Sequence, residues 1–331
     1  MKRPATVVCL REFGEPEKVV GVEQWDLPEV RPQQVLVDVI AAPINPADLN
    51  LIEGTYGMVL ALPSVVGNEG VGVIAEVGGA VTHLAVGQRV IAPVRLGWWC
   101  TARVLDAVDV FPISSDIPRD VAAMLTINPA TAYRMLMDFV PLKHGDWIVQ
   151  NAANSAVGRF VIQIARHKGW RTVNVVRRRE LIEELKADGA DVVVTDETPL
   201  SKQIRALTGG VEPLLGLNAV GGESAREIAK SLGPHGTLVT YGAMGRQPLQ
   251  IANSLLIFKD IRFRGFWVSE WYRHAMRTQI EEMFAELIPL VQAGKLHAPV
   301  EKTFPLAQVR EAIAHARRGG HNGKILLEMQ P

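Results

Sequence analysis

The chain has 331 residues, 48% hydrophobic and 21% charged, a composition that suits about two domains with a sizeable buried core. Lysine plus arginine and aspartate plus glutamate number 35 each, so the formal charge is zero and gives no electrostatic basis for binding nucleic acid or an anionic membrane surface. The two cysteines, Cys9 and Cys100, exclude a four-cysteine zinc lobe and any disulfide framework.

The N-terminal residues do not have the pattern of a signal peptide. The apolar stretch 5–10 ends at Arg11 and Glu12 and is too short for the core of a signal peptide, and no run approaches the ~20 apolar residues of a membrane span. We therefore expect a soluble, cytoplasmic protein. A mitochondrial matrix protein whose leader had been removed would look the same.

The first 120 residues are rich in valine, glycine and proline and favour strands. The stretches 33–46 and 70–78 are strand-like, and 86–94 follows with a turn at Gly87. Helical periodicity is scarce here, which predicts a β-dominated module.

The pattern changes near Val121. Residues 120–139 have helical periodicity, with a break expected at Pro129, and strands then alternate with helices. We expect strands over 146–152, 171–177, 191–196, 214–220 and 236–244, and helices over 156–169, 180–189 and 223–233. This alternation predicts parallel βαβ units in a doubly wound sheet, an α/β fold. Further along, 260–269 and 324–329 read as strands and 281–294 as a helix.

The first turn from strand to helix in this series, "QNAANSAVG", is a candidate cofactor cradle. Such a turn presents backbone N–H groups and a helix N-terminus to a pyrophosphate. Of the usual three glycines only Gly158 is present, while Ala156 and Val157 open the helix and Asn154 and Ser155 offer side-chain donors.

Three arginines, Arg177, Arg178 and Arg179, follow the next strand. In NAD-binding sheets an acidic residue near this position accepts hydrogen bonds from the ribose, whereas guanidinium groups bind a 2′-phosphate. The pattern predicts NADPH as the cofactor. Glu180 is the alternative ribose ligand if the strand ends one residue later than expected.

Several stretches carry a family resemblance over nearly the whole chain. They are "INPADLNLIEGTYG", "VVGNEGVG", "INPATAYRMLMDF", "IVQNAANSAVG", "GTLVTYGAM" and "LLIFKDIRFRGFWVSEW". They resemble the medium-chain dehydrogenase/reductase superfamily, and within it the mitochondrial-type 2-enoyl thioester reductases. One departure is Ala156, where that branch more often has glycine.

The resemblance implies a domain plan. We expect a GroES-like catalytic domain over 1–123, a Rossmann cofactor domain over 124–266 and a C-terminal return over 267–331 that completes the catalytic domain. The resemblance also implies a homodimer joined through the edges of the two sheets, and 260–269 alternates apolar with charged residues as a strand with one wet face would.

In zinc-dependent members of the superfamily a histidine of the "GNEG" turn binds the metal, and here that place is Asn68. We therefore expect no catalytic zinc. The resemblance implies Tyr56 as the catalytic proton donor, since a phenol with an ordinary pKa of ~10 can donate to an enolate oxygen or protonate C2.

The resemblance also implies the remaining cofactor contacts. Asn128 is placed at the nicotinamide, and Lys324 reaches the cofactor from the C-terminal return. The other expected contacts follow two strand ends and are Tyr241, Gly242, Ala243 and Met244, and Phe266, Trp267, Val268 and Ser269, with Trp267 also a candidate wall of the acyl pocket.

The function expected from these features is zinc-independent, NADPH-dependent reduction of the C2=C3 bond of a trans-2-enoyl thioester of CoA or acyl carrier protein, with hydride added to C3 and a proton to C2. The first alternative is an NADPH-dependent quinone or alkenal reductase of the same superfamily. The second is a non-catalytic NADPH-binding protein.

Overall fold

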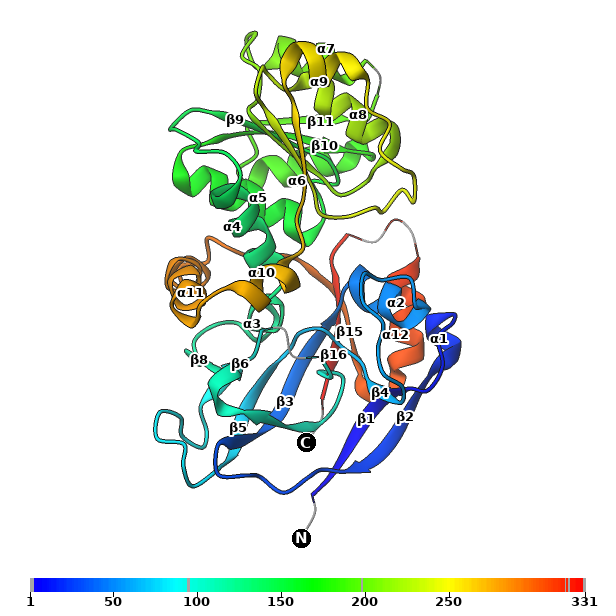
Figure 1. The fold of residues 1–331 in the computed structure, drawn as a ribbon, viewed down its shortest axis with the longest axis vertical. Helices are drawn as coiled ribbons and strands as arrows, with labels where there is room; N and C mark the ends of the chain where they lie inside the picture. The colour runs from blue at the N-terminus through cyan, green and yellow to red at the C-terminus, as the bar shows by residue number, and fades with distance from the viewer. Residues whose placement is uncertain (1–2, 94–95, 198, 319, 321, 330–331) are drawn as a thin grey trace. The chain divides into compact units, whose positions relative to one another are not determined.

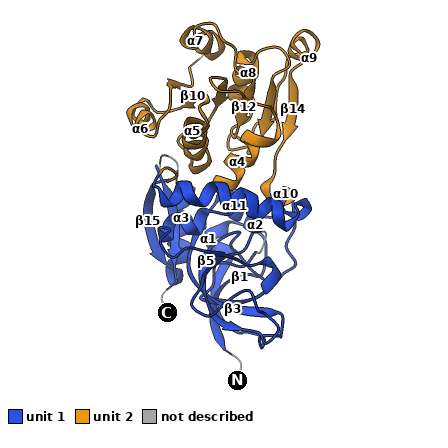
Figure 2. Cartoon of the chain, turned by 90° about the vertical axis from the view of Figure 1, so that its left-hand side faces the viewer, with its two compact units in different colours: residues 1–127, 272–294, 298–331 blue, residues 128–271, 295–297 orange. Residues whose placement is uncertain are grey.

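The computed structural model describes residues 3–93, 96–197, 199–318, 320 and 322–329, and it divides into two compact units. The first unit contains residues 1–127, 272–294 and 298–331, and the second contains 128–271 and 295–297 (Figure 2). The domain bounds expected from the sequence stay a prediction.

The first unit is built mainly of antiparallel strands. Its strands are β1 (Pro4–Leu10), β2 (Val20–Asp26), β3 (Gln34–Ile44), β4 (Ser64–Val65), β5 (Val71–Val77), β6 (Arg89–Ile91), β7 (Ala102–Asp106), β8 (Phe111–Ile113), β15 (Val300–Pro305) and β16 (Lys324–Glu328). One sheet has the order β15-β16-β3-β5-β6-β8, with β7 also paired to β3, and a smaller sheet has the order β2-β1-β4 (Figure 1). The β-dominated module predicted from the sequence is confirmed.

The helices of this unit are α1 (Pro16–Val19), α2 (Pro46–Glu53), α3 (Arg119–Met124), α11 (Arg277–Gln292) and α12 (Val309–Arg317). The core between these elements and the sheets includes two fully buried tryptophans, Trp98 and Trp99. Gly67 has φ +101°, and a Cβ there would lie 2.4 Å from the Trp99 ring, so the turn before β5 needs glycine.

The second unit contains a parallel six-stranded sheet with the order β11-β10-β9-β12-β13-β14. The strands are β9 (Trp147–Gln150), β10 (Arg171–Val176), β11 (Val192–Thr195), β12 (Leu215–Asn218), β13 (Thr237–Thr240) and β14 (Arg262–Gly265). In chain order this is 3-2-1-4-5-6, the Rossmann arrangement, whose order reverses at β9. The doubly wound parallel sheet predicted from the alternation is confirmed.

The helices of the second unit are α4 (Asn128–Asp138), α5 (Ala156–Lys168), α6 (Ile182–Ala187), α7 (Leu200–Leu207), α8 (Gly222–Ser231), α9 (Asn253–Lys259) and the start of α10 (Val268–His274). Strands β9, β10, β12 and β13 are almost wholly buried, as expected of a parallel sheet covered on both faces.

Two expectations about element boundaries are wrong. The helical break lies at residues 125–127, not at Pro129, because proline in the first turn of α4 removes no hydrogen bond that the helix needs. The strand expected over 260–269 ends at Gly265, and Val268 and Ser269 belong to α10.

Candidate active site

The turn after β9 and the first turn of α5 form the centre of the candidate cofactor site. Ser155 is the N-cap of α5, and its hydroxyl accepts a hydrogen bond of 3.1 Å from the Gly158 N–H. The N–H groups of the first helical turn have no partner within the helix and carry the positive end of its dipole. The site is therefore built to receive an anion at the amino end of a 13-residue helix.

Gly158 is required by close packing in this turn. A Cβ at this position would lie 2.5 Å from the Ala153 carbonyl oxygen, a separation that only a backbone shift could relieve. The Gln150 side chain donates a 2.9 Å hydrogen bond to the Gly158 carbonyl, which attaches the helix to the strand before it. Together these contacts make a tight turn of the kind that a pyrophosphate needs.

The neighbouring strands end at the same edge of the sheet. Arg177, Arg178 and Arg179 follow β10, Tyr241–Met244 follow β13, and Phe266 follows β14. Because the strands are parallel, the structure brings these predicted residues together at the carboxyl edge of the sheet, where α/β folds bind ligands. Arg177 and Arg179 are exposed, and Arg178 lies 3.8 Å from Glu180.

Two buried asparagines that the sequence analysis did not identify organise this edge. The Asn151 side chain donates to Asn218 Oδ1 at 2.9 Å and accepts from the Ala219 N–H at 2.8 Å, and Asn218 donates to Thr240 Oγ1 at 3.1 Å. These bonds connect the ends of β9, β12 and β13. The available signal was an asparagine at the end of each of two predicted parallel strands.

A buried tyrosine hydroxyl supports a polar ligand at this edge. The Tyr241 hydroxyl is buried and makes no hydrogen bond of ordinary geometry among the described residues, although the Ser155 side chain lies near it. Burial raises the pKa of Tyr241, and the nearby Ser155 side chain lowers it in part. Near the amino end of α5, which suits an anion, this buried hydroxyl fits a bound dinucleotide.

A second set of polar residues is buried in the first unit. Lys324 begins β16 and Asn45 directly follows β3, and the pairing of Ile325 with Ile44 brings the two side chains together. The Lys324 ammonium donates to Asn45 Oδ1, and Asn45 Nδ2 donates to Glu69 Oε1 at 2.8 Å.

Two carboxylates of this cluster hold backbone groups. Asp48 accepts from the N–H groups of Asn45 at 2.7 Å and Asn68 at 2.8 Å. Glu69 accepts from Thr126 Oγ1 at 3.1 Å and from the Ile127 N–H at 2.9 Å, next to the first residue of α4.

Burial is the main influence on the charges of this cluster. It raises the pKa of Asp48 to about 6 and that of Glu69 to about 7, and it lowers the pKa of Lys324, while attraction between the ammonium and the carboxylates opposes all three shifts. Asn45, Asp48 and Glu69 were not predicted as partners of Lys324 because they lie more than 250 positions from it in the chain.

The other predicted site residues differ in burial. Tyr56 is half-buried and packs at the edge of the core of the first unit, just after the C-cap of α2. Asn128 is 5% exposed and is the first residue of α4. Trp267 is half-buried, and Phe266 packs edge-to-face on Phe139 with ring centroids 5.9 Å apart.

Residues 31–109 match the model for the alcohol dehydrogenase GroES-like domain, and residues 156–288 match the model described as zinc-binding dehydrogenase. The chain is 43% identical to the mitochondrial enoyl-[acyl-carrier-protein] reductase of Homo sapiens, over 98% of this chain and 90% of the human protein. The chain belongs to this family of the medium-chain dehydrogenase/reductase superfamily. A Caenorhabditis elegans member is 48% identical over 80% of this chain and 77% of its own length.

Solved structures agree with the family fold. A putative NADPH:quinone reductase of Bacillus thuringiensis superposes with a TM-score of 0.92 at 29% identity, over 98% of this chain and 99% of that one. A complex of Etr1p with NADP and crotonyl-CoA has a TM-score of 0.90 at 28% identity, over 98% and 100% of the two chains. The predicted combination of a GroES-like domain with a Rossmann sheet is confirmed.

Two other features are absent from the described residues. No three His, Cys, Asp or Glu side chains there are grouped so that they could hold a metal ion. In the same part of the chain, no helix is long and apolar enough to cross a membrane.

Proposed function

We propose that the protein is an NADPH-dependent reductase of the C2=C3 double bond of trans-2-enoyl thioesters of CoA or acyl carrier protein. The observation that carries the proposal is the carboxyl edge of the parallel sheet, where a capped helix N-terminus and three arginines follow neighbouring strands. Family membership adds the substrate class, because the relatives that match along nearly the whole chain are enoyl-[acyl-carrier-protein] reductases.

The residues at that edge have separate roles toward NADPH. Asn154, Ser155, Ala156 and Val157 hold the pyrophosphate, Arg177, Arg178 and Arg179 hold the 2′-phosphate, and Asn128, Tyr241–Met244, Phe266–Ser269 and Lys324 complete the cofactor contacts. Bound NADPH supplies a hydride for C3 of the substrate. The exposed guanidinium groups suit a 2′-phosphate because a fork of N–H donors matches its oxygens and its charge.

Tyr56 serves the proton side of the reaction. Negative charge develops on the thioester oxygen when the double bond is reduced, and a hydrogen bond from the phenol stabilises it or leads to protonation of C2. Tyr56 lies in a loop that begins at the left-handed C-cap Gly54, with its ring half-buried against the core. Such packing restricts the ring while leaving part of it exposed to a ligand.

A quinone reductase is the second candidate, because the putative NADPH:quinone reductase of Bacillus thuringiensis has the same fold over 98% of this chain. A spectrophotometric assay of NADPH oxidation with crotonyl-CoA, a longer enoyl-CoA and a quinone separates the two. The proposal expects turnover with the thioesters well above that with the quinone. The reverse order would establish the quinone reductase, and tight NADPH binding without turnover of any acceptor would establish a binding protein.

Independence from zinc is part of the proposal. Asn68 and Asn45 are weak ligands compared with histidine and cysteine, and the buried Lys324 ammonium next to Asn45 would repel a divalent cation. We expect no stoichiometric zinc by elemental analysis and full activity after exhaustive chelation. About one zinc per chain, lost together with activity, would overturn this part.

We also propose a homodimer formed through the β14 edge of the parallel sheet. Helix α9 lies beside this edge (Figure 2). It exposes Leu256, Ile257 and Phe258, the last with 81% of its surface accessible. An unpaired strand edge next to exposed apolar side chains is a surface that proteins normally cover. A related 2-enoyl thioester reductase of Candida tropicalis is described as a heterodimer.

In a eukaryotic source the mitochondrial matrix would be the compartment, as the names of the relatives suggest.

A further inference from the structure

Arg159 is a buried charge that the proposed chemistry leaves unexplained. It directly follows Gly158 in the first turn of α5, and only 2% of its surface is exposed. A guanidinium cannot lose its charge, so its burial is costly unless ionic partners and hydrogen bonds compensate it. Its location beside the cradle makes those partners relevant to cofactor binding.

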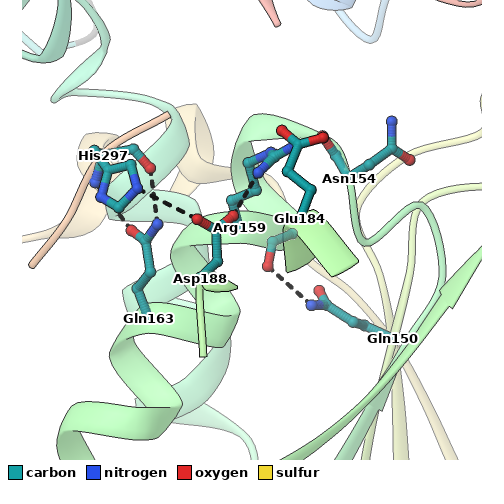
Figure 3. A network of polar contacts seen from close by, with 8 residues as sticks. Gln150, Asn154, Arg159, Gln163, Glu184, Asp188 and His297 are labelled. Carbon is teal, nitrogen blue, oxygen red and sulfur yellow. Dashed lines mark hydrogen bonds and ion pairs between the residues drawn. The ribbon is translucent and has the colours of Figure 1, made fainter. Parts of the chain in front are cut away.

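The guanidinium connects the cradle to α6. One terminal nitrogen pairs with Asp188, the C-cap of α6, and the other lies 2.5 Å from Glu184 Oε1, as Figure 3 shows. Its Nε donates to the Asn154 carbonyl oxygen at 3.4 Å, a long contact inside the turn before α5. One side chain therefore links the turn, the first turn of α5 and the end of α6.

The same carboxylate also contacts the C-terminal return of the chain. His297 Nε2 lies 3.3 Å from Asp188 Oδ1. Gln163, one turn beyond Arg159 on α5, donates to the His297 carbonyl and accepts from the His297 N–H, both at 3.0 Å (Figure 3). Residues 295–297 are thus held to the second unit although α11 and β15 on either side belong to the first.

We propose that Arg159 is a positioning residue for the cofactor: by holding Asn154 and balancing Asp188 and Glu184, it fixes the turn that binds the pyrophosphate. This inference rests on the proposed NADPH site. Its effect has two physical sources. A turn held in place before binding loses less conformational entropy when the ligand arrives. Without the guanidinium, two carboxylates near the cradle would also repel an anionic pyrophosphate.

Loss of Arg159 should weaken the binding of both NADPH and NADH, whereas loss of the 2′-phosphate arginines should weaken only NADPH. NADPH and NADH have the same pyrophosphate, so Arg159→Met should weaken both by the same factor, which we expect to be about tenfold. At saturating NADPH, kcat should stay within about threefold, because Arg159 acts on binding and not on the reacting atoms. Arg159→Lys should recover part of the affinity, since lysine restores the charge without the planar fork.

The test is a fluorescence titration of the purified full-length protein with NADPH and with NADH, well below the unfolding temperature. Arg166→Met is the matched control, because Arg166 lies on the same helix with its side chain exposed. We expect Arg166→Met to bind both cofactors within about twofold of the parent. Equal cofactor affinity of Arg159→Met and the parent would overturn the inference, even if the variant unfolded at a lower temperature.

A replacement variant and the cofactor affinity of the parent keep the test decisive. If Arg159→Met does not fold, Arg159→Lys replaces it, since lysine keeps the charge but cannot contact Asn154, Glu184 and Asp188 together. If the affinities for NADPH and NADH fall equally, by about threefold, the result supports the inference. Unchanged affinity for both cofactors contradicts it. If the parent binds neither cofactor, the proposed function fails. If the parent binds and the variants bind equally well, only the role of Arg159 fails.

Discussion

Tyr56 is the proposed proton donor. Its place after "LIEG" gives no chemistry by itself, and the role comes from the family resemblance. The structure adds that the ring is half-buried in a loop beginning at Gly54. Removing the hydroxyl should therefore change chemistry more than folding.

Tyr56→Phe should reduce turnover of crotonyl-CoA by roughly 10²–10⁴-fold, the range for a positioned acid or oxyanion donor. NADPH affinity and the unfolding temperature should remain close to those of the parent. Reduction of a quinone should fall much less, because its protons can come from water. Steady-state kinetics with both acceptors checks this, and a parental rate with crotonyl-CoA would remove Tyr56 from the mechanism.

At the residue scale, the proposed function assigns the choice of cofactor to the arginines after β10. Replacing Arg177 and Arg178 with glutamine should weaken NADPH by about 1.5–3 kcal/mol per lost charge-assisted bond and leave NADH nearly unchanged. Calorimetric titration with both cofactors measures the difference. Arg205→Gln, which removes an exposed arginine from α7, is the control and should alter neither affinity. Equal losses for NADPH and NADH would place the 2′-phosphate elsewhere.

At the scale of elements, the strand–helix alternation was predictable and the break between α3 and α4 was not. Buried parallel strands and amphipathic helices leave local patterns, so β9 to β13 and the helices α5, α6 and α8 could be found in the sequence. A proline can mark either the end of one helix or the first turn of the next. Pro129 lies in the first turn of α4. α12 and α7 were missed as well.

The buried cluster around Glu69 also depends on how elements pair, and it makes stability depend on pH. The folded pKa of Glu69, about 7, lies above its ordinary value of 4.5, so the folded state keeps a proton that the unfolded chain has lost between these pH values. The free energy of unfolding should therefore fall as pH rises through this window. Between pH 5 and pH 8 the contribution should be about 2–3 kcal/mol.

Chemical denaturation of the parent and of Glu69→Gln at both pH values measures this contribution. The variant lacks the titrating group, so its free energy of unfolding should fall less between pH 5 and pH 8, by that same amount. Glu76→Gln, on the exposed face of β5, is the control and should keep the parental pH dependence. Identical pH dependence in the parent and Glu69→Gln would mean that burial does not raise this pKa.

At the scale of the whole molecule, the proposed assembly is a homodimer joined through the β14 edge. Changing Phe258 to aspartate should separate the dimer, because the charge would be buried where the exposed ring of α9 is expected to pack. Sedimentation velocity at micromolar concentration should give a dimer for the parent and a monomer for the variant. Val211→Asp, at another exposed apolar residue of the second unit, should remain a dimer. A monomeric parent would reject the proposed interface.

The arrangement of the whole chain shows where sequence reasoning ends. The two kinds of domain were predictable because each has its own periodicity and motifs. The burial of Lys324 against Asn45 was not, because it depends on β16 pairing with β3, and the two residues are 279 positions apart. The ion pairs of Arg159 were not predictable either, because Glu184 lies on another helix, α6, and Asp188 is the C-cap of that helix.

The proposed activity is the reduction of enoyl thioesters with NADPH, and following the hydride into the product decides whether the protein has it. Crotonyl-CoA would be incubated with NADPH that carries deuterium at both C4 positions of the nicotinamide, and the product would be examined by mass spectrometry and NMR. We predict butyryl-CoA with a single deuterium at C3 and a solvent proton at C2. Unchanged crotonyl-CoA, under conditions in which the same preparation reduces a quinone, would contradict it.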